Sequence, residues 1–130
     1  MAIDLKNTSA NDLLDRYDTL FPAGAILEMR SGAPPGAENA ATGTLIASIT
    51  LPATPWAAAA AGSKAKSGTW SDPSADAAGT LAHYRLKNAG DTHREEGTIT
   101  ATGGGGDMTV DNTSVAAAQV VTITGFTRTL

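Results

Sequence analysis

The sequence predicts a mainly β fold: an antiparallel β-sandwich or open barrel of about seven short strands, with one amphipathic helix near its start. Three observations predict it. Apolar residues recur at helical spacing in only one segment, residues 9–21. From residue 25 onward they alternate with polar residues in short runs, which is the period of strands buried on one face. Glycine, proline, asparagine and aspartate separate these runs and supply turns.

The helix is predicted from a single apolar stripe. Its members are Ala10, Leu13, Leu14, Tyr17, Leu20 and Phe21. Ser9 and Asp12 resemble a capping box, with aspartate in place of glutamate, and Pro22 ends the helix. Acidic residues off the stripe are interpreted as a solvated face: Asp12, Asp15 and Asp18. We expect the stripe to pack on the sheet, and the alternative is a helix offered to a partner subunit.

Seven segments show the strand signal: residues 25–30, 45–51, 68–70, 80–87, 95–101, 108–110 and 119–129. Residues 88–91 predict a hairpin turn, because asparagine and glycine tolerate positive φ. The four glycines at 103–106 predict a flexible loop. The alanines at 57–61 fit either a short helix or an extended segment, since Pro55 and Gly62 leave room for barely two turns.

The last strand breaks its own alternation. Val121 and Ile123 share one face, whereas Phe126 falls on the opposite face. Gly125 lies between them, which predicts a β-bulge that returns Phe126 to the core. We also expect Gly125 to hold a backbone conformation that other residues adopt poorly.

The composition predicts a thin core. Leucine, isoleucine, valine and phenylalanine together supply 22 of 130 residues, whereas alanine, threonine and glycine supply 57. The net charge of -4 is too small for a disordered chain of this composition. A folded domain with so few large apolar residues gains little from burial, so we expect partner subunits to complete its stability.

Charge and composition also exclude classes of partner. Basic residues form no cluster beyond Lys64 and Lys66, so we predict no nucleic-acid binding. The absence of cysteine excludes disulfides and thiolate metal sites. No apolar run reaches the length of a membrane-spanning helix, so we predict no membrane association. The first residues lack the pattern of a signal peptide, and we expect the protein to begin in the cytoplasm of the cell that makes it.

The residues that carry chemistry are too few and too scattered for a catalytic site. His83 and His93 could approach each other across the 88–91 hairpin and bind a metal with Glu95 or Glu96, but a metal site needs three or four ligands in fixed geometry, and we expect both histidines to face solvent. Glu95 and Glu96 are adjacent, so on a strand they point to opposite faces and cannot act as a pair. We therefore predict that the protein is not an enzyme and has no catalytic residue, no metal, no cofactor and no small-molecule substrate.

The two tryptophans have different expected roles. Trp70 lies in a predicted strand and is expected in the core, whereas Trp56, among prolines and alanines, is expected at an interface. We expect residues 1–8 to form an N-terminal arm that lies across a neighbouring subunit, and residues 9–130 to form a single β-sandwich domain. The candidate protein-interface residues are Ile3, Leu5, Pro34, Pro35 and Trp56.

Several short segments follow the helix in a recognisable order. They are LEMRSGAPP at 27–35, GTLIA at 43–47, AGT at 78–80, YRL at 84–86, GTI at 97–99 and VTITGF at 121–126. In this order, over roughly residues 9–129, the chain resembles a family of small virion structural proteins encoded by tailed bacteriophages. No single segment is specific to that family. Trp56 with its alanine run and the acidic helix face depart from the pattern and leave the binding surface open.

The resemblance implies a virion component, and we expect a capsid decoration (cement) protein on the capsid surface, assembled in the host bacterial cytoplasm. Its expected partners are the major capsid protein and copies of itself in a homotrimer. A tail or head–tail junction component is the alternative. In that role the chain would be a receptor- or carbohydrate-binding module, with Trp56, Tyr84 or Trp70 as a stacking platform.

Overall fold

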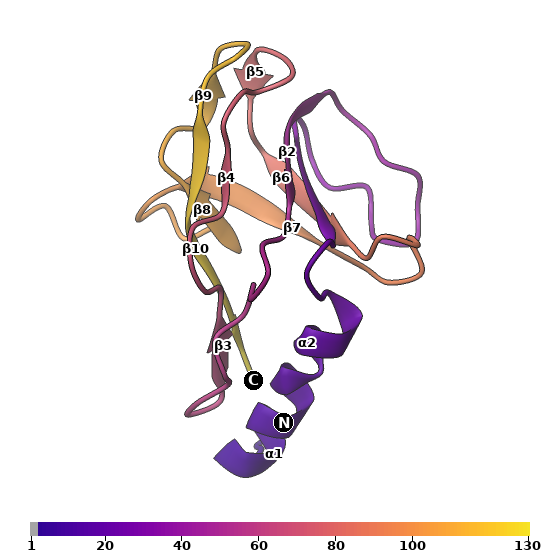
Figure 1. Ribbon diagram of the computed structural model, residues 1–130, viewed down its shortest axis with the longest axis vertical. Helices are drawn as coiled ribbons and strands as arrows, with labels where there is room; N and C mark the ends of the chain where they lie inside the picture. Colours follow the sequence, from indigo (N-terminus) through magenta and orange to yellow (C-terminus); the bar gives the residue numbers. More distant parts are fainter. Residues whose placement is uncertain (1–2) are drawn as a thin grey trace.

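The computed structural model describes residues 3–130 and confirms the mainly β fold with a short amino-terminal helical segment (Figure 1). The helices are α1 (Asn7–Asp15) and α2 (Tyr17–Leu20). The strands are β1 (Ile26–Arg30), β2 (Leu45–Thr50), β3 (Ser63–Ala65), β4 (Ser71–Asp72), β5 (Gly79–Thr80), β6 (His83–Lys87), β7 (Arg94–Ala101), β8 (Met108–Val110), β9 (Ser114–Val115) and β10 (Val121–Thr129).

The strands form one curled sheet, a half-barrel, and a small second sheet. The order in the curled sheet is β2-β1-β6-β7-β8-β10-β3, and β4 pairs with the first residues of β10. The second sheet pairs β5 with β9 at the end of the molecule opposite the helices (Figure 1). Hairpins join β1 to β2 and β6 to β7, and the predicted turn at residues 88–91 lies in the second of them. Asp91 donates its backbone N–H to the carbonyl of Asn88 there.

One pairing in the curled sheet is parallel, contrary to the all-antiparallel expectation. β7 and β8 run in the same direction, with Ile99 opposite Met108, although only residues 102–107 connect them. The glycine run makes this short crossover feasible. Gly103 and Gly105 have φ of 85° and 83°, and a Cβ on Gly104 would lie 2.7 Å from the Thr100 side chain. The glycines therefore allow the chain to pass close to the Thr100 side chain and turn back within a few residues.

The predicted bulge in β10 is confirmed. The pairing of β10 with β8 shifts register between Ile123 and Gly125, and Phe126 is 1% exposed. The expected reason for glycine was wrong, because Gly125 does not have a positive φ. Glycine is needed here for lack of room, because a Cβ at this position would lie 2.7 Å from Oγ1 of Thr109.

The helical segment differs from its prediction at three points. It begins at Asn7, inside the predicted arm, and Lys6 precedes it without any side-chain cap, so the capping box of Ser9 is wrong. It breaks at Arg16 into α1 and α2. Leu13 of the predicted apolar stripe is 58% exposed, because the buried face of α1 is narrow and centres on Ala10 and Leu14.

Five of the six tryptophan, tyrosine and phenylalanine side chains are buried in the core, and the sixth, Tyr17, is half-buried and packs against it. The two tryptophans, two tyrosines and two phenylalanines form one chain of ring contacts: Tyr17, Phe21, Trp56, Trp70, Tyr84 and Phe126. The ring centroids lie 5.1–5.6 Å apart, mostly edge-to-face. Trp70 is fully buried, as predicted, although residues 68–70 form no strand. The cluster runs from α2 into the curled sheet and joins the two.

β6 is buried on both faces, which its alternating sequence did not predict. Residues 83–86 are all buried, including His83 and Arg85. The reason is the segment between β1 and β2, residues 31–44, which contacts Arg85 on the face away from the aromatic core. Residues 57–60 form no helix, and the chain turns back at Ala61 and Gly62, which have φ of 50° and 76°, so that Ala60 pairs with Ser63.

Candidate functional site

Exposed apolar side chains gather at one end of the molecule, which we call the helical end. It comprises residues 3–6 (the arm), α1, α2, the hairpin of residues 56–66 and Leu130, and it lies at the bottom of Figure 1. Among the described residues, four large apolar side chains are exposed. Ile3 (89%), Leu13 (58%) and Leu130 (59%) belong to the helical end, and only Val120 (52%) lies elsewhere. Apolar exposure concentrated in this way marks a contact surface.

Helical side chains hold the hairpin of residues 56–66 in place. The backbone N–H of Gly62 donates to Oδ1 of Asn11 at 2.9 Å, and the N–H of Ala59 donates to Oδ1 of Asp15 at the same distance. The N–H of Leu130 donates to the carbonyl of Gly62, so the end of β10 is fixed to the same turn. The helical end is thus a built surface, with α1, the hairpin and Leu130 in fixed relation.

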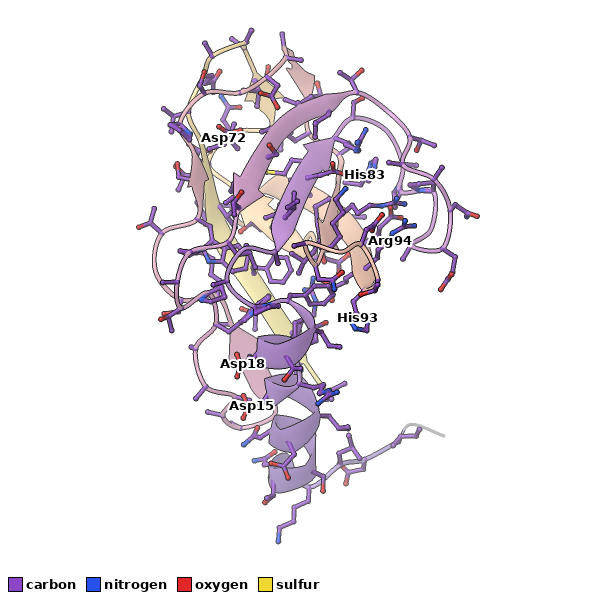
Figure 2. The ribbon with its side chains drawn as sticks, turned by 45° about the vertical axis from the view of Figure 1, so that its right-hand side comes forward. Asp15, Asp18, Asp72, His83, His93 and Arg94 are labelled. Carbon is purple, nitrogen blue, oxygen red and sulfur yellow. The ribbon has the colours of Figure 1, made fainter. Side chains whose placement is uncertain are left out.

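A buried lysine anchors the helices to β3. Lys64 is 1% exposed, and its ammonium donates to Asp15 at 2.7 Å, to Asp18 at 3.3 Å and to the carbonyl of Ala57 at 2.9 Å. Figure 2 shows both aspartates on the side of the helical segment that faces β3. The Lys64 hydrogen bond, helped by the N–H of Ala59, lowers the pKa of Asp15 below its ordinary value. Asp15 and Asp18 therefore bind Lys64 while their side chains stay 43% and 55% exposed, so the predicted solvated face is solvent-accessible but also has a structural role.

A second polar cluster joins α2 to the concave side of the sheet. Tyr17 of α2 and Tyr84 of β6 both donate to the Glu95 carboxylate, and Arg128 of β10 pairs with it at 2.5 Å. The guanidinium of Arg128 also lies 4.2 Å from the Phe126 ring centroid. Burial raises the pKa of Tyr17 to about 12, and the Glu95 hydrogen bond acts in the same direction. The Tyr17 hydroxyl therefore stays protonated at neutral pH and remains a donor.

The next residue on β7, Glu96, holds the long segment on the opposite face. It pairs with Arg85 at 2.5 Å, and the two side chains are only 5% and 4% exposed. Arg85 also donates to the carbonyl of Asn39, and Glu96 accepts the backbone N–H of Gly36. Residues 31–44 are therefore fixed at their middle. Glu95 and Glu96 point to opposite faces, as predicted.

A shallow apolar depression of about 310 Å³ lies beside α2. Its lining includes Asp18, Pro22, Ala23, Ala53, Pro55 and Trp56. Pro22, Ala23 and Ala53 are exposed at its walls, whereas the indole of Trp56 is 5% exposed and forms part of the floor. The indole N–H donates to the carbonyl of Phe21 at 2.9 Å. The lining is apolar apart from the half-exposed carboxylate of Asp18 and the hydroxyl of Thr54.

The structure separates the predicted interface residues. Ile3 is fully available on the arm, and Leu5 is half-buried. Pro34 is exposed and Pro35 half-buried, but both lie in the 31–44 segment, away from the arm. The Trp56 indole, expected at an interface, is only 5% exposed, because it packs on the rings of Tyr17, Trp70 and Phe126 and leaves only an edge to line the depression.

The two histidines considered for a metal site lie in different environments. His83 is fully buried rather than exposed, and its Nδ1 lies 2.7 Å from the carbonyl of Gly32. His93 is exposed in the β6–β7 hairpin, and Figure 2 shows the two rings apart. Among residues 3–130, no three histidine, aspartate or glutamate side chains are placed to hold a metal ion together.

Sequence reasoning missed the polar side chains that hold the helical end. Lys64 was considered only as a member of a small basic pair, and Tyr17 and Arg128 were not considered as polar groups at all. The spacing of Asp15 and Asp18, three residues apart on one helical face, is the one local signal of a shared cation. The partners of Tyr17 and Arg128 lie 78 and 33 residues away, so no local pattern shows them.

Comparison with known proteins identifies no relative: no family model, no curated protein and no solved structure matches this chain. Within the described part of the chain, the helices are too short and too polar to cross a bilayer.

Proposed function

We propose that this chain is a non-enzymatic structural protein of a tailed-bacteriophage virion, a decoration (cement) protein that stabilises the capsid by protein–protein contacts. The observation that supports it is the concentration of exposed apolar side chains at the helical end: Ile3 on the arm, Leu13 on α1, and Leu130, whose backbone is held by Gly62. Exposed apolar side chains gathered at one end of a folded β domain are typical of a surface that binds another protein.

The polar groups of the interior support a structural role. Glu95 is engaged by Tyr17, Tyr84 and Arg128, and Glu96 by Arg85. A general acid or base must be free to reach a substrate proton, whereas these carboxylates are committed to holding the helices and the 31–44 segment. We therefore propose that their role is rigidity. A particle lattice needs that property in each subunit.

The proposed partners are the major capsid protein and further copies of this chain, with the virion surface as its location and the host cytoplasm as the place of assembly. A tail or head–tail junction role is the alternative. The structure does not favour a carbohydrate-binding tail module, because the aromatic residues expected to stack on a sugar are buried: Trp56, Tyr84 and Trp70 are 5%, 1% and 0% exposed.

Counting copies tests the proposal. In purified particles of the phage that encodes this chain, quantitative mass spectrometry is expected to find on the order of hundreds of copies per particle, as a symmetric lattice requires. About a dozen copies or fewer would place the chain in the tail. Absence from washed particles would contradict a virion role.

A further inference from the structure

We propose that the arm of one chain, with Ile3 at its tip, docks in the Trp56 depression of a second copy of this chain. This inference deepens the proposed function, because it names the contact between copies on which a decoration oligomer would depend. It brings together Ile3, Leu5 and Trp56, three predicted interface residues that a single chain keeps apart.

The arm has the chemistry of an inserted strand. Ile3 and Leu5 alternate with Asp4 and Lys6, so an extended arm places both apolar side chains on one face and both charges on the other. Ile3 is 89% exposed within its own chain, the highest value among the large apolar residues described. Figure 2 shows the arm leaving the first turn of α1 and running apart from the sheet.

The depression has the complementary chemistry. Pro22, Ala23 and Ala53 give it apolar walls, and the Trp56 indole gives it an apolar floor. A volume of about 310 Å³ accommodates a branched aliphatic side chain and part of a second one. At its rim, Asp18 keeps a side chain that is 55% exposed despite its contact with Lys64. Lys6 supplies the arm with a cation for that carboxylate.

The geometry of the helical segment requires a second copy. Ile3 is tethered to Asn7, the first residue of α1, and four residues span at most about 14 Å even when fully extended. Asp18, on the near rim of the depression, lies eleven residues beyond Asn7, which is roughly 16 Å along a helix. Pro22 lies further still. The arm therefore does not reach the depression of its own chain, whereas the arm of a second copy is not limited by this tether.

The arm and the depression lie at opposite ends of the helical segment, so the contact joins two different surfaces. A contact of this kind is head-to-tail, and it closes into a ring when the rotation between copies divides a full turn. A threefold rotation, that of the expected homotrimer, is one such case.

Directed cross-linking tests the inference, and the chain is suited to it because it contains no cysteine. Chains carrying Ile3→Cys are mixed with tagged chains carrying Ala53→Cys and oxidised gently. Both positions are exposed, so neither change threatens the fold. A disulfide requires Cβ atoms about 4 Å apart, so we expect a disulfide-linked heterodimer. The matched control replaces Ala53→Cys with Val120→Cys, at an exposed residue outside the helical end, and is expected to give at least about tenfold less product.

Equal yields with Ala53→Cys and Val120→Cys would overturn the inference. So would a chain carrying both Ile3→Cys and Ala53→Cys that closes on itself as a monomer at high dilution. In sedimentation, Ile3→Asp is expected to weaken self-association about 10- to 100-fold, while Ile3→Leu leaves it within about twofold. All these readouts use purified protein. A negative result in these experiments would overturn the contact between copies. It would not affect the proposed function, which is tested separately by the number of copies in the particle.

Discussion

Two ionic contacts hold the two additions to the curled sheet, and they differ in their access to water. Arg85 and Glu96, which fix residues 31–44, are both nearly inaccessible at 4% and 5% exposure. Lys64, which fixes the helices, is equally buried at 1%, but its partners Asp15 and Asp18 are 43% and 55% exposed. In the Arg85–Glu96 pair both charged groups are shielded from water, whereas in the Lys64 contact only the lysine is shielded.

The difference decides what happens when each contact is broken. Removal of Arg85 leaves the Glu96 carboxylate without water and without a counter-charge, which is a costly state. Removal of Lys64 leaves two aspartates that water can solvate at once. We therefore expect the 31–44 segment to be locked to the fold as a whole, and the helical end to loosen at lower cost.

The largest effect is expected for Arg85→Met. It leaves Glu96 buried and unpaired and removes the donor to the carbonyl of Asn39, so the free energy of unfolding should fall by about 3–5 kcal/mol. Urea denaturation measures the change. Arg94→Met is the matched control: Arg94 also donates to a carbonyl of the 31–44 segment, that of Ala37, but its ionic partner Asp91 is 41% exposed, so its cost should be much smaller than that of Arg85→Met. Equal costs for the two variants would break the distinction between shielded and open contacts.

A smaller effect is expected for Lys64→Met. The methionine keeps most of the buried stem but leaves the carbonyl of Ala57 unpartnered, so the cost should be about 2 kcal/mol. Hydrogen exchange should accelerate in α1 and in residues 56–66 before it does so in β6. Lys66→Met, at a half-buried position on the same hairpin, should cost no more than about 0.5 kcal/mol. A cost for Lys64→Met as large as that for Arg85→Met would contradict the comparison.

Tyr17→Phe is expected to cost about 1 kcal/mol. The ring keeps its contacts with Phe21 and Trp56, and only the hydroxyl that donates to Glu95 is lost. Tryptophan fluorescence should therefore be almost unchanged while the unfolding midpoint falls. A blue or red shift comparable to that of unfolding would show that the hydroxyl, and not the ring, positions the helix.

The smallest effect is expected in the acid dependence. The hydrogen bond from Lys64 lowers the pKa of Asp15, so the stabilisation is fully present above the ordinary value of 3.8 and is lost as the pH falls through the lowered value. The difference in unfolding free energy between the wild type and Lys64→Met should therefore shrink between pH 6 and pH 3. A difference that stays constant over this range would show that Asp15 contributes nothing through its charge.

Local patterns predicted the elements whose environment is local. β1 and β10 follow the alternation of their sequences, and the register shift at Gly125 follows from the broken parity of Phe126. β6 shows the limit of this reasoning. The alternation in the β6 sequence predicts one solvent-exposed face, but the 31–44 segment covers that face and buries His83 and Arg85. Arg85 is buried because it contacts Glu96, Gly36 and Asn39. The last two lie 49 and 46 positions before it in the sequence, so no short pattern contains them.

The candidate site was predictable only in part, for the same reason. Ile3 lies outside every predicted helix and strand and is 89% exposed in the structure, so its exposure was predictable. The near-complete burial of Trp56 was not predictable, because its neighbours in sequence are small, whereas its neighbours in space are Tyr17, Trp70 and Phe126. The burial of Lys64 was equally unpredictable, since it depends on a helix that precedes it by about fifty residues.

The central claim is that the helical end is the surface that attaches to the virion, and rebinding to particles assembled without this chain tests it most directly. Purified wild type, Leu130→Asp, Leu13→Asp and Val120→Asp would be titrated onto such particles; Leu130 is 59% exposed and takes no part in the proposed contact between copies. We expect Val120→Asp to bind like the wild type, and each helical-end variant to bind at least about tenfold more weakly, because a charge replaces a buried apolar contact. Equal binding by all four proteins, or a loss confined to Val120→Asp, would contradict the claim.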